Sequence, residues 1–190
     1  MSQSLPPVPY RKSKRVKGYD YTSPGSYAIT ICAHNGRAIF GKVTDGEMIL
    51  NPLGKLANKC CQDFGKRHKR IRLDAFVIMP NHIHILFTIL ERHPNAIIVL
   101  KERAFGDSIA GSVSAYIGGY KGSVTQHAKN RGLISGPPLW QSLFWDRIVR
   151  DDLEFENQRN YIDTNPARWL KDQLHPDALP NKFNEEWHKS

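Results

Sequence analysis

Residues 72–90 read RLDAFVIMPNHIHILFTIL, which is two apolar segments separated by the dipeptide Pro80-Asn81. The segments 72–79 and 82–90 are rich in β-branched and aromatic residues, and these residue types favour strands. Proline and asparagine between two such segments favour a turn. Because both segments are apolar at nearly every position, we expect two neighbouring strands at the centre of the fold.

The preceding sequence has the pattern of an antiparallel sheet. Residues 26–34 (SYAITICAH) alternate between apolar and polar positions, and Asn35-Gly36 is a two-residue hairpin signal. The pattern therefore predicts a second strand over residues 37–44, paired with the first. Asp45-Gly46 repeats the turn signal before the short apolar run 47–50.

Apolar residues recur at helical spacing in three further segments, and each begins or ends at a recognisable signal. Asn51-Pro52 is typical of a capped helix start, and Asp151-Asp152 offers caps for a helix that ends before Pro166. Two helices against an antiparallel sheet predict an α+β fold, a ferredoxin-like or RRM-like sandwich with both helices on one face. A last helix follows this sandwich. The predicted helices span residues 52–68, 108–129 and 152–165, a short aromatic strand lies within 139–150, and residues 91–107 have no assignment.

The composition indicates one basic globular domain. The chain has 190 residues, 40% of them hydrophobic, and a formal net charge of +9, so disorder and fibrous repeats are excluded. No apolar run is long enough to cross a bilayer, and no signal peptide is recognisable, so the simplest expectation is a cytoplasmic protein. Three cysteines in no metal or disulfide spacing are expected to be reduced thiols.

The positive charge is concentrated in two places, an N-terminal arm and the cluster 66–72. We expect residues 1–24 to form a flexible basic arm, 25–175 the folded domain and 176–190 a C-terminal tail. Such patches are typical of proteins that bind nucleic acid, which we favour slightly over a merely solvated basic face. The arm's basic residues are Arg11, Lys12, Lys14, Arg15 and Lys17.

Two histidines two residues apart are the sharpest candidate for chemistry. Side chains alternate along a strand, so His82 and His84 should share one face and Ile83 and Ile85 the other. Two imidazoles on one face can bind a metal ion together. The alternative is that they only satisfy backbone groups, and an H-x-H motif alone favours that structural role.

A second candidate lies on the predicted last helix. Tyr161 and Asn165 are four residues apart and so lie on one face of a helix, where a phenol and an amide oxygen are presented together. A surface tyrosine and an ordinary helix-ending asparagine before Pro166 are the alternatives.

These motifs together resemble the REP-associated tyrosine transposases, members of the single-tyrosine HUH family. The likeness covers roughly residues 17–170 and rests on a histidine, hydrophobic, histidine strand after Met-Pro-Asn and a tyrosine four residues before Asn-Pro. It implies that His82, His84 and Asn165 bind a divalent metal and that Tyr161 is the nucleophile. The quoted segments are GYDYTSPGSYAITIC (18–32), LDAFVIMPNHIHIL (73–86) and WQSLFWDRIVRDDLEFENQRNYIDTNPARW (140–169).

The resemblance implies a strand-transfer reaction on single-stranded DNA that contains a hairpin or REP-like palindrome. Tyr161 would attack a phosphodiester to give a 5′-phosphotyrosine and a free 3′-OH, with Mg²⁺ or Mn²⁺ offsetting negative charge. The histidine pair alone would equally admit Zn²⁺. Arg147 and Arg150 are expected to contact DNA phosphates, and the protein is expected to act as a monomer or homodimer.

Two other functions fit the same residues. The first is an RRM-like nucleic-acid-binding module without catalysis, in which the histidines are structural. The second is a metal-dependent nuclease that uses water, with Tyr161 only nearby. A covalent protein–DNA adduct is expected for the transferase and for neither alternative.

Overall fold

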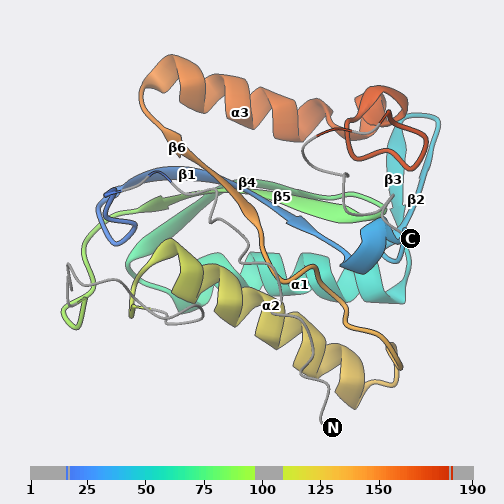
Figure 1. Ribbon diagram of the computed structural model, residues 1–190, viewed down its shortest axis with the longest axis horizontal. Helices are drawn as coiled ribbons and strands as arrows, with labels where there is room; N and C mark the ends of the chain where they lie inside the picture. The colour runs from blue at the N-terminus through green and yellow to red at the C-terminus, as the bar shows by residue number, and fades with distance from the viewer. Residues whose placement is uncertain (1–15, 17, 97–108, 180, 182–190) are drawn as a thin grey trace, which may run out of the picture.

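The apolar residues quoted above form two adjacent antiparallel strands, β4 (Ile71–Ile78) and β5 (His82–Ile89). Two more strands, β1 (Gly25–Cys32) and β6 (Trp145–Val149), complete an antiparallel sheet with the order β4-β5-β1-β6 (Figure 1). The structure is a computed structural model and describes residues 16, 18–96, 109–179 and 181.

The connections between these strands are those of a ferredoxin-like fold. Helix α1 (Pro52–Arg67) lies between β1 and β4, and helix α2 (Val113–Asn130) lies between β5 and β6. This β-α-β-β-α-β order, with β1 between β5 and β6, confirms the predicted α+β sandwich. A third helix, α3 (Asp152–Thr164), follows β6 and carries Tyr161.

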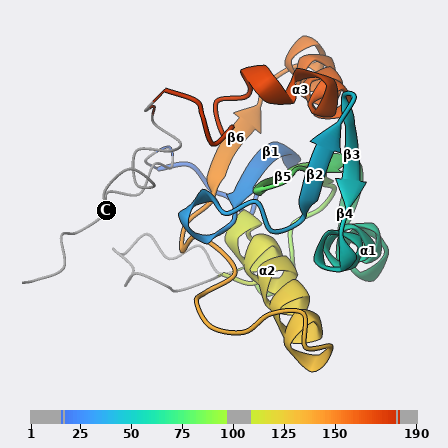
Figure 2. The same ribbon diagram turned by 90° about the vertical axis from the view of Figure 1, so that its right-hand side faces the viewer.

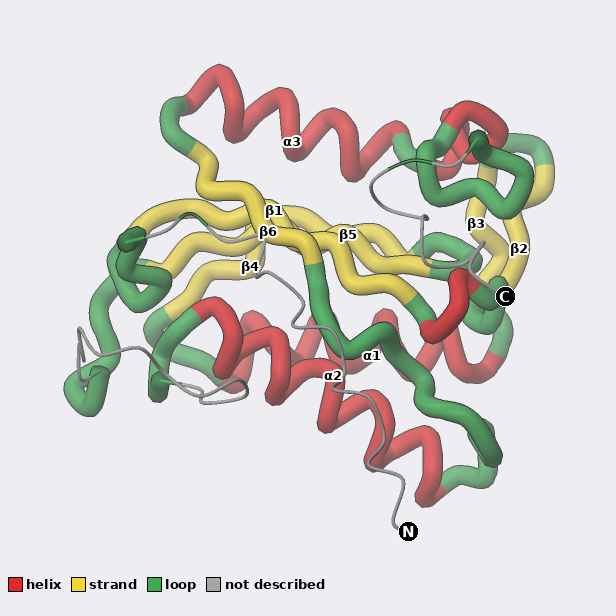
Figure 3. The backbone as a smooth tube through the Cα atoms, viewed as in Figure 1, coloured by secondary structure: helices red, strands yellow, loops and turns green. Residues whose placement is uncertain are grey.

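The helices divide between the two faces of the sheet (Figures 1 and 3). Helices α1 and α2 cover one face, and the main core lies between them and the sheet. Helix α3 lies on the opposite face, and Ile162 is its only buried residue. The sheet side of the core includes Tyr27, Ile29, Ile31, Ile83, Ile85 and Phe87.

Each long helix begins at the residue type that satisfies its free N–H groups. Asn51 caps α1 through its side-chain oxygen, which accepts from the Gly54 N–H at 2.8 Å. Ser112 caps α2, and Asp151 caps α3 by accepting from the Glu154 N–H. The predicted caps Asn51 and Asp151 are therefore confirmed.

The predicted pairing of residues 37–44 with the first strand is wrong. Asn35 and Gly36 do adopt positive φ, 53° and 63°, but within a single 3₁₀ turn over His34–Gly36 after which the chain leaves the sheet. The second turn signal, Asp45-Gly46, makes the hairpin instead, between β2 (Gly41–Thr44) and β3 (Glu47–Leu50).

This β2–β3 hairpin forms a separate two-stranded sheet beside the main one (Figure 2). It extends from α1 to a 3₁₀ helix, Pro166–Lys171, that follows α3. A Cβ on Gly46 would lie 3.5 Å from Cα of Ala167, so the hairpin tip touches that helix. The hairpin therefore supports the segment that follows α3.

Helix α3 lies over β4 and β5 and is also fixed by polar contacts at its two ends. At its start, Glu154 accepts hydrogen bonds from the Arg147 guanidinium at 2.5 Å and from the Arg150 backbone N–H at 2.9 Å. At its end, Ile162 and Trp169 are buried. Toward β1 and β6, a groove of about 1220 Å³ separates α3 from the sheet.

Some predicted features fall outside the part of the chain that the structure describes. The arm residues Arg11, Lys12, Lys14, Arg15 and Lys17 are among them, as are residues 97–108 and most of the predicted tail. Within the described ranges, none of the helices combines the length and the apolar character needed to span a bilayer.

Replacing Gly54 by alanine tests how closely α1 packs on the preceding loop. Alanine favours a helix by up to about 1 kcal/mol over glycine, but a Cβ here would lie 2.0 Å from the Phe40 carbonyl oxygen. We expect Gly54→Ala to lower the free energy of unfolding by about 1–3 kcal/mol, measured by urea denaturation.

The matched control is Gly118→Ala in α2, where a Cβ would meet no atom within 4 Å. This variant should be more stable than the unmodified protein by about 0.5–1 kcal/mol. If both variants changed stability in the same direction, the close approach of α1 to Phe40 would be contradicted.

Candidate metal and tyrosine site

The two predicted histidines occupy one face of β5, directed toward α3. His82 pairs with Cys32 and His84 with Thr30 across the strand register, while Ile83 and Ile85 enter the core on the other face. Both imidazoles are buried, with exposed fractions of 0% and 7%, and their ring centroids lie 4.6 Å apart.

Asn81 fixes the tautomer of His82. The Asn81 side-chain N–H₂ donates to the backbone carbonyls of Gly36 and Leu174, at 3.2 and 2.7 Å, so its Oδ1 faces His82 as an acceptor. His82 Nδ1 lies 2.8 Å from that oxygen and therefore carries the proton. The lone pair of His82 is then on Nε2, which lies 4.0 Å from Asp172 Oδ2 and is available to a metal.

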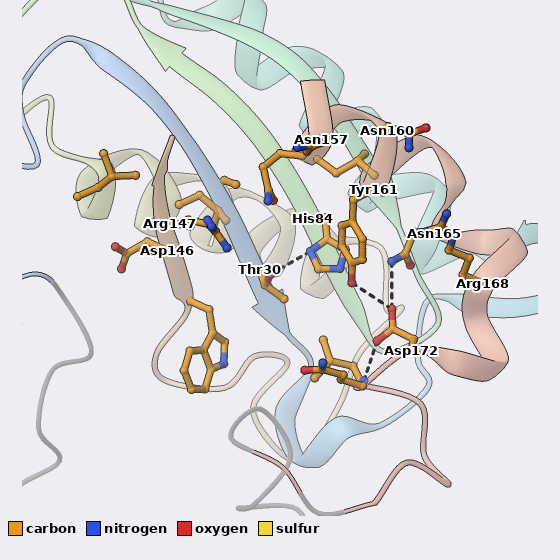
Figure 4. A pocket seen from close by; sticks show the side chains of 18 of the residues that line it. Thr30, His84, Asp146, Arg147, Asn157, Asn160, Tyr161, Asn165, Arg168 and Asp172 are labelled. Atoms are coloured by element: carbon orange, nitrogen blue, oxygen red, sulfur yellow. Dashed lines mark hydrogen bonds between the residues drawn. The ribbon is translucent and has the colours of Figure 1, made fainter. Parts of the chain in front are cut away.

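Thr30 holds the ring orientation of His84. The Thr30 hydroxyl is 2.9 Å from His84 Nδ1, so the remaining ring nitrogen, Nε2, faces the space beneath α3 (Figure 4). Such outer partners of metal-binding histidines hold the ring orientation. Neither Asn81 nor Thr30 was among the predicted site residues, because a hydrogen-bond partner across a strand or a turn leaves no spacing in the sequence.

The predicted pair on α3 reaches the histidines. Tyr161 is 37% exposed, and its ring centroid lies 5.1 Å from that of His84 (Figure 4). Asn165, at the end of the same helix, is buried, and its Nδ2 donates to Asp172 Oδ2 at 3.0 Å. The structure thus brings together all four predicted residues, His82, His84, Tyr161 and Asn165.

Asp172 is a site residue that the sequence analysis missed. It follows the 3₁₀ helix, and its carboxylate accepts from the Leu174 N–H through Oδ1 at 2.7 Å and from Asn165 through Oδ2. The Tyr161 hydroxyl lies 3.5 Å from Oδ2. Nothing in the local sequence distinguishes this aspartate, because the turn after α3 is what folds it back onto β5.

Several buried nitrogen and oxygen atoms of the described residues that have no hydrogen-bond partner are suited to bind a divalent metal ion. Four buried side-chain N or O atoms in the described part of the chain lack a hydrogen bond, and three of them are His82 Nε2, His84 Nε2 and Asn165 Oδ1. Ligand atoms of His82, His84 and Asp172 all lie within 4.8 Å of one another. Since metal–ligand bonds are about 2.1 Å long, two ligands of one ion lie at most about 4.2 Å apart, so the widest pair has to approach by at least about 0.6 Å when an ion binds.

The electrostatics suit metal binding at neutral pH. Burial lowers the pKa of His82 well below its ordinary value and lowers that of His84 to about 4, so both rings are neutral and have free lone pairs. Burial, together with the Asp172 carboxylate, raises the pKa of Tyr161 to about 12. A bound cation would offset the negative charge of Asp172 beside the phenol.

The groove beneath α3 opens from this cluster. Arg147 and Arg150, both predicted to contact DNA, line it on the β6 side. Arg168 and Lys171, which were not predicted, line it near Tyr161, and Arg168 lowers the pKa of that tyrosine. The groove therefore has basic side chains near both of its ends.

Comparison with known proteins identifies relatives over nearly the whole chain. No protein-family model matches. An uncharacterised protein of Haemophilus influenzae is 33% identical over 174 residues, which cover 90% of this chain and 96% of the relative. A second protein from this organism, which bears the name "Putative REP-associated tyrosine transposase", is 25% identical over 177 residues, or 88% of this chain and 90% of the relative.

A solved structure has the same fold. It is the structure of a REP-associated tyrosine transposase bound to a REP hairpin, and its TM-score against this chain is 0.54. The match covers 90% of this chain and 93% of the other, at 16% sequence identity. The antiparallel sheet with its helices is therefore the architecture of that protein as well.

The Asp172→Asn variant tests whether Asp172 belongs to the metal site. The substitution keeps the size of the side chain and removes its charge, so we expect Mn²⁺ to bind at least roughly tenfold more weakly. Isothermal titration calorimetry of the metal-free protein with Mn²⁺ measures this. Asp163→Asn, an exposed acid on α3, is the control and should bind Mn²⁺ like the unmodified protein. Equal Mn²⁺ affinity in all three proteins would exclude Asp172 as a ligand.

Proposed function

The chain belongs to the family of the REP-associated tyrosine transposases, and on that premise we propose that it is a metal-dependent transposase that cuts and rejoins single-stranded DNA at hairpins. One observation carries the proposal. The Tyr161 phenol lies beside a buried group of metal-binding atoms with no other partners, at the end of a groove with basic side chains.

We propose that His82 and His84 hold the metal through Nε2, with Asn165 Oδ1 and Asp172 Oδ2 as the oxygen ligands. When bound, Mg²⁺ or Mn²⁺ would offset the charge that develops on a phosphate in the transition state. Oxygen ligands favour these hard ions, and two imidazoles also admit Zn²⁺. Asn81 and Thr30 contribute by holding the two imidazole rings with their lone pairs toward the site.

Tyr161 is the proposed nucleophile. Its phenolic oxygen would form a bond to the phosphorus of a DNA phosphodiester as the bond from phosphorus to the 3′ oxygen breaks. The products are a 5′-phosphotyrosine and a DNA end with a free 3′-OH. Because the new phosphodiester retains the bond energy, attack by another 3′-OH restores both the DNA strand and the free tyrosine without an external energy source.

The reaction also moves two protons. The phenol must lose its proton, and water in the groove accepts it, because Asp172 Oδ2, 3.5 Å from the hydroxyl, is occupied as a proposed metal ligand. The departing 3′ oxygen needs a proton in turn and takes it from water. Arg168 favours the phenolate, since its charge lowers the pKa of Tyr161.

The substrate strand is proposed to lie in the groove between α3 and β6. Arg147 and Arg150 would contact its phosphates on one side, and Arg168 and Lys171 would contact them near Tyr161. Hairpin DNA is the proposed substrate because a family relative has been solved with a REP hairpin. The arm residues Arg11, Lys12, Lys14, Arg15 and Lys17 stay predicted as additional phosphate contacts.

Tyr161→Phe tests the nucleophile. In the presence of Mg²⁺ or Mn²⁺, the unmodified protein should form a covalent adduct with a labelled single-stranded hairpin, seen as a band shifted by the protein's mass on a denaturing gel. The adduct should be absent with EDTA and in Tyr161→Phe and His82→Ala. Tyr116→Phe, on α2 at the opposite face of the sheet, is the matched control and should retain it.

Other outcomes of the same gel identify the two alternative functions. Cleavage that persists in Tyr161→Phe without an adduct would indicate a nuclease that uses water. Binding of hairpins with no cleavage under any metal condition would indicate a nucleic-acid-binding module.

Arg150→Ala tests the path of the strand. Loss of one phosphate contact should weaken binding uniformly across sequences and reduce the slope of log affinity against log salt concentration by about 1. Fluorescence anisotropy at several salt concentrations measures the slope. Arg131→Ala, at the end of α2 on the other side of the sheet, should leave the slope unchanged, and equal slopes for all three proteins would contradict the proposed path.

A further inference from the structure

Beyond the metal cluster, the floor of the groove includes a small side chain. On this face of the sheet, the cross-strand row of Trp145, Thr30 and His84 is followed by the row of Arg147, Ala28 and Leu86. Ala28 lines the groove at this point, and its methyl group is the smallest side chain of the two rows. A planar group between α3 and the sheet therefore fits best there.

Helix α3 presents one polar stripe to this space. Asn157, Tyr161 and Asn165 are spaced four residues apart and so lie on the same face of the helix. Figure 4 shows the Asn157 side chain pointing into the groove above Thr30 and His84, on the same side of α3 as the Tyr161 ring. Asn157 therefore lies one helical turn, about 6 Å along the axis, from the proposed nucleophile.

Asn157 has no side-chain hydrogen bond to a described residue, whereas two polar side chains near it, Thr30 and Glu154, have partners. Thr30 is bonded to His84, and Glu154 is bonded to Arg147. The carboxamide of Asn157 makes no hydrogen bond with any residue in the described parts of the chain, and it is exposed to the groove. Its two donors and its acceptor are thus free for a ligand.

We propose that Asn157 reads the base of a nucleotide adjacent to the scissile phosphate, and so sets part of the sequence preference of the proposed reaction. This inference rests on the proposed function, because it places the substrate strand in the same groove. One helical turn is comparable to the length of one nucleotide in an extended strand. A strand with its reacting phosphate at Tyr161 therefore brings the neighbouring base over Ala28 and beside Asn157.

The chemistry of an amide favours a base over a phosphate at this position. Phosphates are bound by the cations of the groove, Arg150, Arg168 and Lys171, which carry charge but no sequence information. A neutral amide presents a donor beside an acceptor, and this pair matches the N6 and N7 atoms of adenine in a bidentate contact.

The test measures base preference in binding, so that it does not depend on cleavage. Labelled hairpins carry each of the four bases at each unpaired position flanking the scissile bond, and fluorescence anisotropy in Mg²⁺ gives their affinities. The protein is Tyr161→Phe, which leaves the DNA intact. We expect one flanking position at which the best base binds about tenfold more tightly than the worst. Adding Asn157→Ala should reduce that ratio to about twofold or less at that position alone.

The control adds Gln62→Ala, an exposed amide on α1 at the other face of the sheet, and should keep the full ratio. The inference is overturned if no flanking position shows a preference, if Asn157→Ala leaves the ratio unchanged, or if Gln62→Ala removes it as well. Failure of the proposed function would show differently, as the absence of a Tyr161 adduct in the unmodified protein.

Discussion

Strand β5 has the hydrophobic core on one face and the candidate metal site on the other. The rest of the site depends on which residues of β5 face each side. Its alternate residues Ile83 and Ile85 are fully buried in the core against α1 and α2, while His82 and His84 face α3. A shift of one residue in the register would move the imidazoles into the core and the isoleucines into the groove. The hydrophobic core therefore fixes the histidines in place.

The residues of the site that lie on α3, Tyr161 and Asn165, are held by fewer buried contacts than the histidines. Helix α3 buries only Ile162 of its own residues; it lies over β4 and β5 and is fixed by Glu154 at one end and by the segment around Asp172 at the other. Because α3 covers only one half of the sheet, the half formed by β1 and β6 stays open as a groove. This arrangement explains how a small domain can place a tyrosine above a buried cluster and still keep an open groove beside it.

The elements that could be predicted from the sequence are those determined by local periodicity and by caps. The strand pair, the three helices and the one-face placement of His82 and His84 follow from spacing alone. The pairing of residues 37–44 could not be predicted, because a turn with the right dihedral angles does not decide which strand the chain joins next. Asp172 and Asn81 were missed because their roles arise from the return of the chain after α3, a long-range contact with no periodic signal.

The Asn81 amide joins three distant parts of the chain: the turn at Gly36, the histidine strand, and Leu174 beyond α3. Asp172, two residues before Leu174, is bonded to the same segment. If the cluster binds an ion as proposed, docking of this segment and ion binding are thermodynamically linked, and each favours the other by the same factor. Detaching the chain around residue 174 would then weaken ion binding, and a bound ion would in return stabilise that end of the fold.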